Sequence, residues 1–107
     1  MMTLAAVLAE VGGLDEAELV GWVERRWVRA ERTDEGYRFR AVDVARVHLI
    51  REIRHDFAVD EDTMALVLSL LDQVYRLRRQ VRSLADAIAD QPEPVRDGIL
   101  AALRARG

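Results

Sequence analysis

Two histidines and one glutamate are the residues best suited to metal chemistry in this chain. His48, Glu52 and His55 stand at i, i+4 and i+7, so they share one face of the helix expected there. Zinc accepts such ligands, but neither a complete tetrahedral set nor an HExxH pattern accompanies the trio. We therefore expect no metal and no cofactor. We expect His55 and Asp56 to tie this helix to the segment that follows.

Catalytic side chains are scarce. The chain has two histidines and no cysteine, which excludes thiolate nucleophiles and disulfides together. No nucleophile–base pair, glycine-rich phosphate loop or carboxylate dyad is evident. We therefore expect a binding protein and not an enzyme.

Carboxylates gather at two places where helices are expected to begin. The first cluster contains Asp15, Glu16 and Glu18, and the second contains Asp60, Glu61 and Asp62. Acids at a helix start cap it and complement its dipole. The same acids could dock a basic helix of a partner protein, because complementary charge speeds and orients encounter. Both interpretations stay open.

Basic residues argue both for and against nucleic acid. All sixteen are arginine, yet the net charge is −3, whereas a DNA-binding domain usually carries a basic surplus on one face. One basic band lies in the expected long helix and consists of Arg76, Arg78, Arg79 and Arg82. A second lies in the expected β-hairpin and consists of Arg29, Arg32, Arg38 and Arg40. A solvated helix flank explains the first band, and DNA binding is the alternative for both.

The N-terminal third is expected to form a helix-turn-helix and a wing. Residues 3–11 form a helix that Thr3 can cap, Gly12-Gly13 break it, and Asp15 caps a second helix that runs to about residue 25. Residues 27–31 and 37–40 alternate as two strands, and the turn at 33–36 contains Gly36 for positive φ.

Aromatic residues of this region are expected in its core. They are Trp22, Trp27, Tyr37 and Phe39. An aromatic pocket for a drug-like ligand is the alternative.

A connecting helix is expected next, up to residue 57. Its apolar residues recur at steps of three and four and are expected to form the buried stripe: Val42, Ala45, Leu49, Ile50, Ile53 and Phe57.

A heptad seam marks the long helix that begins at residues 60–63. Its apolar residues are Val67, Leu70, Val74, Leu77, Val81, Leu84 and Ile88, and their alternating steps of three and four are typical of a coiled coil. Near its start Met64, Leu68, Leu71 and Tyr75 widen the stripe, so this part is expected to pack on the small domain. Gln91-Pro92-Glu93-Pro94 stops the helix, and 95–106 is a last short helix. No helix of matching length remains in the chain, so we expect a homodimer.

The whole is expected to be mainly α, with a winged helix-turn-helix domain at 1–57 and the long helix and short helix at 58–107. No apolar run approaches a membrane span, and the first residues lack a basic n-region and apolar core. We expect a cytoplasmic location.

Short motifs in this chain resemble a superfamily of winged helix domains and, more narrowly, one family within it. Gly36-Tyr37-Arg38-Phe39, Asp43-Val44-Ala45-Arg46 and the segment 50–54 resemble the wing-to-helix passage of MerR-like winged helix domains. Residues 19–28, 53–60 and 67–77 resemble the chaperone-modulator (CbpM-like) family, chiefly at Arg54-His55-Asp56 and Leu71-Asp72. The resemblance covers about residues 4–85. It departs at Arg26, where a small residue often sits, and at Ala30, where MerR-like chains often have proline.

The resemblance implies a specific partner. Members of the chaperone-modulator family bind the J-domain of a DnaJ-like, curved-DNA-binding co-chaperone, inhibit its stimulation of a DnaK-type chaperone and affect its DNA binding. The implied function is therefore modulation of a co-chaperone, with weak or absent DNA binding. The alternative is a MerR-like DNA-binding transcriptional regulator, and acids at the second helix, against arginines on the wing, distinguish the two.

Overall fold

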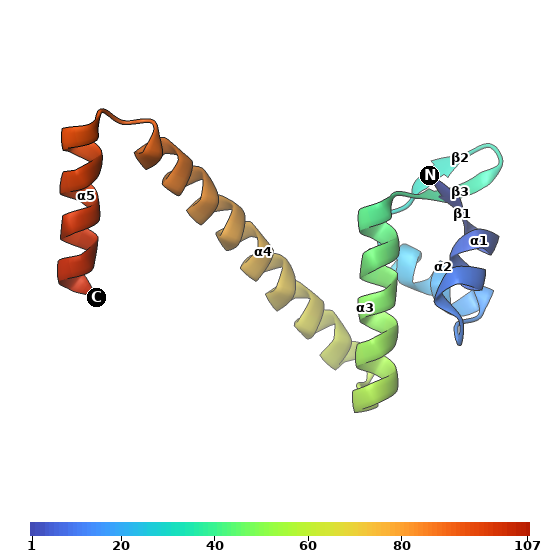
Figure 1. The fold of residues 1–107 in the computed structure, drawn as a ribbon. Helices are drawn as coiled ribbons and strands as arrows, with labels where there is room; N and C mark the ends of the chain where they lie inside the picture. The colour runs from blue at the N-terminus through green and yellow to red at the C-terminus, as the bar shows by residue number, and fades with distance from the viewer. The chain divides into compact units, whose positions relative to one another are not determined.

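A computed structural model describes residues 1–107 as five helices and three short strands (Figure 1). The chain divides into two compact units, Met1–Leu68 and Ser69–Gly107. This division falls inside the long helix, beyond the boundary expected after residue 57. The mainly helical winged helix-turn-helix fold predicted from the sequence is confirmed for the first unit.

Two capped helices form the helix-turn-helix. α1 (Leu4–Val11) begins where the Thr3 hydroxyl accepts a hydrogen bond from the Ala6 N–H, at 3.1 Å. α2 (Glu16–Glu24) begins with a capping box, in which the Asp15 carboxylate accepts from the Glu18 N–H at 2.8 Å. Gly12 and Gly13 take positive φ between the helices. These local predictions are confirmed.

The end of α2 differs from the sequence prediction. The Trp27 N–H donates to the Trp22 carbonyl at 2.9 Å, and the Arg26 N–H donates to the Val23 carbonyl at 3.0 Å. These two bonds make a Schellman motif, with Arg26 at φ 63° in the left-handed region. The prediction of a strand over 27–31 is therefore wrong, because Trp27 and Val28 terminate a helix and are buried in the core.

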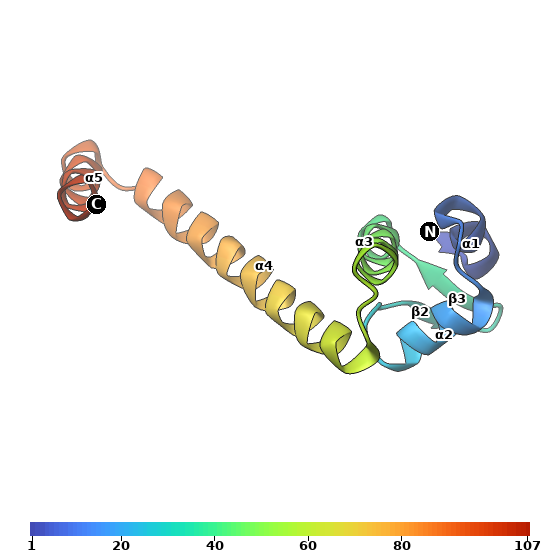
Figure 2. The same ribbon diagram turned by 90° about the horizontal axis from the view of Figure 1, so that it is seen from below.

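The sheet has three strands, not the two that were predicted. β1 (Met2–Thr3), β2 (Glu31–Thr33) and β3 (Gly36–Phe39) are arranged in the order β1-β3-β2. Both pairings are antiparallel, with Met2 opposite Phe39 and Thr33 opposite Gly36. The strands lie beside α1, α2 and α3 (Figure 2), and the two residues before α1 supply the extra edge.

α3 (Ala41–Phe57) buries a different face from the one predicted. Its buried residues are Asp43, Val44, Val47 and Ile50. Of the predicted stripe, Ile50 alone is buried; Leu49 and Ile53 are half-buried and Ala45 is exposed. Val42 and Phe57 are 63% and 73% exposed. The stripe is therefore wrong as a core prediction.

The core of the first unit is built from every element except β1 and β2. Its fully buried larger side chains include Phe39, Leu19, Ile50 and Val7. Trp22 and Trp27 are buried, with ring centroids 6.4 Å apart, whereas Tyr37 is half-buried. The aromatic core prediction is thus confirmed for the tryptophans and Phe39.

α4 (Glu61–Ala89) and α5 (Glu93–Arg106) complete the chain. In the first turns of α4, Met64 and Leu68 are fully or almost fully buried, as predicted. Further along, Leu71 is half-buried and Tyr75 exposed. α4 ends before Pro92, and α5 exposes Val95 and Leu103. No helix is long and apolar enough to cross a membrane.

Candidate functional site

The first acidic cluster lies at the start of α2, where its members have different roles. Asp15 caps the helix, and Glu18 completes the capping box by accepting the Asp15 N–H at 3.5 Å. Glu16 is exposed and makes no hydrogen bond or ion pair within the chain. Only Glu16 therefore has a carboxylate with no structural task.

The second acidic cluster, at the start of α4, divides in the same way. The Asp60 carboxylate accepts the Thr63 N–H at 2.7 Å. This backbone bond, a side-chain bond with Thr63 and the nearby Arg54 lower the pKa of Asp60. Glu61 forms an ion pair of 2.6 Å with Arg25, and Asp62 is exposed without a partner.

The Arg25–Glu61 ion pair shows where the clusters lie relative to each other. Arg25 is the C-cap of α2, so the second cluster stands at the C-terminal end of the helix whose N-terminal end carries the first. A helix of nine residues is about 14 Å long. The structure therefore places the two clusters at opposite ends of α2, on the first unit.

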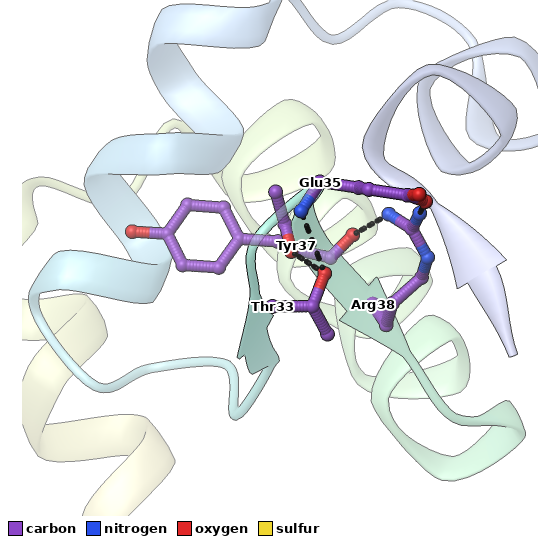
Figure 3. A network of polar contacts seen from close by, with 5 residues as sticks. Thr33, Glu35, Tyr37 and Arg38 are labelled. Carbon is purple, nitrogen blue, oxygen red and sulfur yellow. Dashed lines mark hydrogen bonds and ion pairs between the residues drawn. The ribbon is translucent and has the colours of Figure 1, made fainter.

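The wing arginines are engaged within the chain. Arg38 donates to the Tyr37 carbonyl at 3.1 Å and pairs with Glu35 at 2.9 Å. Figure 3 shows the Tyr37 ring and the Arg38 guanidinium on opposite sides of the strand. The same view shows the Thr33 hydroxyl holding the turn, by donating to the Gly36 carbonyl at 2.7 Å and accepting from the Glu35 N–H at 3.3 Å.

Further arginines of the wing and of α3 are also bound. Arg40 pairs with buried Asp43 at 3.1 Å, and this contact raises the pKa of Arg40. Arg46 donates to the Trp27 carbonyl, and Arg32 lies over the Tyr37 ring, 5.9 Å from its centroid. Arg29 is exposed and free of such contacts.

The predicted dimer seam lies on the surface of α4. Five of its seven positions are exposed: Leu70, Val74, Leu77, Val81 and Leu84. Val67 and Ile88 are half-buried. The four arginines Arg76, Arg78, Arg79 and Arg82 are exposed on the same helix. The seam is thus an uncovered apolar stripe.

The histidines are not brought together. His48 Nε2 lies 3.9 Å from a Glu10 oxygen, whereas His55 lines a cleft near the α1–α2 turn. No group of three or more His, Asp or Glu side chains is placed to hold a metal ion. His55 and Asp56 form no hydrogen bond or ion pair, so the predicted tie between the helices is not made by their side chains.

Two features of the site are not predictable from the sequence pattern. One is the Arg25–Glu61 pair, and the other is the cleft of about 210 Å³ that Arg51, Arg54 and His55 line from α3. The spacing of these α3 residues, i, i+3 and i+4, marked a common face. The residues opposite them, Glu18 and Trp22 on α2, are far away in sequence and could not be paired with them by pattern.

The fold and the comparisons together define the class of the protein. Helix-turn-helix, β-hairpin wing, connecting helix and long helix follow one another in the chain. The sequence model of the family described as "MerR HTH family regulatory protein" matches residues 4–86. The chain belongs to this family. No curated protein and no solved structure shows significant similarity to it.

Proposed function

We propose that this protein is a chaperone modulator that binds the J-domain of a DnaJ-like co-chaperone and inhibits its stimulation of a DnaK-type chaperone. The narrower resemblance in residues 19–28, 53–60 and 67–77 supports this choice within the MerR family. The proposed role is binding and needs neither catalysis nor a cofactor.

One observation carries the proposal: carboxylates surround the helix that would read DNA. In helix-turn-helix proteins the start of the second helix approaches phosphates and base edges. Here that start carries Asp15, Glu16 and Glu18, all exposed, and the phosphate backbone repels such charges. An acidic surface instead complements a basic helix of a protein partner.

The state of the wing supports the same choice. Arg38 and Arg40 are ion-paired within the chain, so they would have to give up carboxylate partners to bind phosphate. Their pairing lowers the positive potential that DNA binding requires. The proposed partner is therefore a basic protein surface and DNA binding is weak.

A DNA-binding transcriptional regulator is the second candidate. Its support is the family itself, together with Arg29 and Arg32, which are exposed on the wing without a carboxylate partner. Fluorescence anisotropy with random and defined duplexes at near-physiological salt separates the two functions. Tight binding to one duplex, with a strong preference over random DNA, would establish the regulator instead.

The direct test uses the J-domain of the co-chaperone from the same host. We expect co-elution with the purified protein, loss of J-domain-stimulated DnaK-type ATPase activity, and slower association at high salt because exposed charges are screened. If the intact protein binds no J-domain from its own host, the proposal fails.

The contribution of each acidic cluster to J-domain binding can be tested separately with substitutions that preserve the fold. Glu16→Arg and Asp62→Arg reverse the carboxylates that hold no cap, so they leave Asp15, Glu18 and Asp60 in place. We expect one reversal to weaken J-domain binding and to leave the melting temperature unchanged. Normal binding by both variants, and by the triple reversals of each cluster in folded protein, would show that an apolar surface carries the contact.

We propose further that the seam of α4 is covered by a second copy of the chain. It is a continuous apolar stripe with Val81 and Leu84 exposed by 65% and 63%. Such a stripe is the pattern that two helices bury in a coiled coil.

A further inference from the structure

The cleft beside α2 contains an arginine with an unsatisfied buried nitrogen. Arg51 Nε is buried and no acceptor of the chain bonds to it. Arg51 takes part in none of the ion pairs of the chain. A buried donor without a partner costs free energy, and a charged one costs more. Arg51 as a whole is half-buried and lines the cleft, so the rest of its guanidinium is the part that an acceptor from outside the chain would meet.

Packing, and not an ion pair, holds the Arg51 guanidinium in place. A Cβ atom built on Gly13 would lie 2.6 Å from one terminal nitrogen of Arg51 and 3.0 Å from Nε. Gly13 also has φ 63°, a conformation that favours glycine. The missing side chain at Gly13 thus makes the room in which the guanidinium lies.

The charges around the cleft set the class of ligand. Its lining comprises Arg51, Arg54, His55, Glu18, Trp22, Leu14 and Gly13. Two guanidinium groups face one carboxylate, so the arginines and the glutamate of the lining together carry a net charge of +1. A singly charged anion balances this charge, whereas a dianion would exceed it and would be repelled more strongly by Glu18. The planar fork of arginine matches a carboxylate in two parallel hydrogen bonds.

We propose that the cleft between α2 and α3 binds one carboxylate, held by Arg51 and Arg54 against Trp22. Arg51 supplies terminal N–H groups, since its Nε is sealed from solvent and lies beside Gly13, and Arg54 adds charge from the next turn of α3. The carboxylate is that of a free small acid or of an acidic side chain in a partner. This proposal does not rest on the co-chaperone proposal: it is argued from the arginines of α3, although Glu18 of the first acidic cluster also lines the cleft.

Side-chain NMR of the intact protein tests the site directly. Benzoate, acetate, a blocked aspartate, inorganic phosphate and chloride are titrated at constant ionic strength. We expect saturable shifts of the Arg51 Nε–H and the Trp22 indole N–H with carboxylates, and little change at the Trp27 indole, which is outside the lining. Tighter binding of blocked aspartate than of acetate points to a partner's side chain, and the reverse order points to a free acid.

Substitutions of Arg51 test its role in carboxylate binding, and a substitution of an arginine outside the cleft is the control. We expect Arg51→Gln to weaken carboxylate binding at least about tenfold, as loss of a charged hydrogen bond does, and Arg51→Lys to restore only part of it. Arg79→Gln, an equal charge change on exposed α4, should bind like the unmutated protein. Equal shifts with chloride, tighter binding of phosphate than of carboxylates, or full binding by a folded Arg51→Gln variant would overturn the proposal. Because the unmutated protein reports on Arg51 itself, the test does not depend on any variant folding.

Discussion

Carboxylates that look alike in the sequence have different surroundings in the structure. Asp15 and Asp60 accept backbone N–H groups at helix starts, and Asp43 is buried against Arg40. Glu16 and Asp62 are exposed and unpaired. The caps could be predicted because a cap depends on residues three positions apart. The Arg25–Glu61 pair could not, because its partners are brought together only by the fold.

The cap at Asp60 predicts a specific dependence of stability on pH. Hydrogen bonds from Thr63, and the charge of Arg54, lower the pKa of Asp60 in the folded protein. Its contribution is therefore complete above the unfolded pKa, about 3.9, and is lost as pH falls through the lower folded pKa. Asp60→Asn keeps a capping oxygen but cannot titrate.

Urea unfolding of both proteins between acidic and neutral pH measures this effect. The difference in the free energy of unfolding, unmutated protein minus Asp60→Asn, should be largest at neutral pH and shrink in acid. The other carboxylates are common to both proteins and cancel in this difference. A difference that stays constant across the pH range would mean that Asp60 contributes no charge-dependent capping.

At the scale of elements, the residue type and the backbone conformation disagree at the C-terminal end of α2. Its Schellman motif places Arg26 in the left-handed region, where glycine is the favoured residue. The sequence resemblance already showed Arg26 as a departure from a small residue. Trp27 and Val28 have high strand propensity, yet they follow the motif outside any strand and are buried in the core.

Replacement of Arg26 by glycine should stabilise the protein. A non-glycine residue in the left-handed region costs about 1–2 kcal/mol, and part of this is returned as extra entropy of the unfolded glycine. We expect Arg26→Gly to raise the free energy of unfolding by up to about 1 kcal/mol. Arg29→Gly is the matched control, because Arg29 has no positive φ, and it should be neutral or destabilising. Calorimetry decides; a lower melting temperature for Arg26→Gly would contradict the prediction.

α3 shows why the spacing of apolar residues alone does not identify the buried face of a helix. Its apolar residues form two stripes, one through Val42, Leu49 and Phe57 and one through Val44, Val47 and Ile50. Both satisfy helical spacing, and the predicted stripe took the first set together with Ile50, which belongs to the second. The neighbouring α1 and β3 contact α3 and fix which face is inward, and this information is not in the spacing of α3 itself.

The two stripes predict opposite outcomes of mutation. Ile50 is fully buried, so Ile50→Ala should lower the free energy of unfolding by about 2–5 kcal/mol. Phe57 is 73% exposed, so Phe57→Ala should change it by no more than about 0.5 kcal/mol. Both can be measured by urea denaturation at one protein concentration. A larger loss for Phe57→Ala than for Ile50→Ala would mean that the face of α3 is assigned wrongly.

At the scale of the whole molecule, most helix ends follow from local signals in the sequence, whereas the limit of a compact unit depends on which side chains are buried together. Capping residues, glycines and prolines mark most helix ends, from Thr3 to Pro92, because these signals are local. The first unit instead ends at Leu68 within an unbroken helix, because Met64 and Leu68 are buried with it. Beyond Leu68 the apolar stripe of α4 continues with exposed residues, among them Leu70, Val74 and Leu77.

The exposed apolar stripe of α4 leads to a prediction about the oligomeric state of the protein. A second copy would cover Leu70, Val74 and Leu77 from the facing helix, and we expect a homodimer at tens of micromolar, roughly the range for an interface of this class. Val74→Glu with Leu77→Glu should give a monomer or an unfolded chain, because burying unpaired charge is costly. Arg79→Gln with Arg82→Gln, on the exposed basic band, should leave the dimer intact. Light scattering measures the oligomeric state, and circular dichroism shows whether each variant is folded. If the unmutated protein is a monomer at these concentrations, the homodimer prediction is wrong and the seam must bind a different partner.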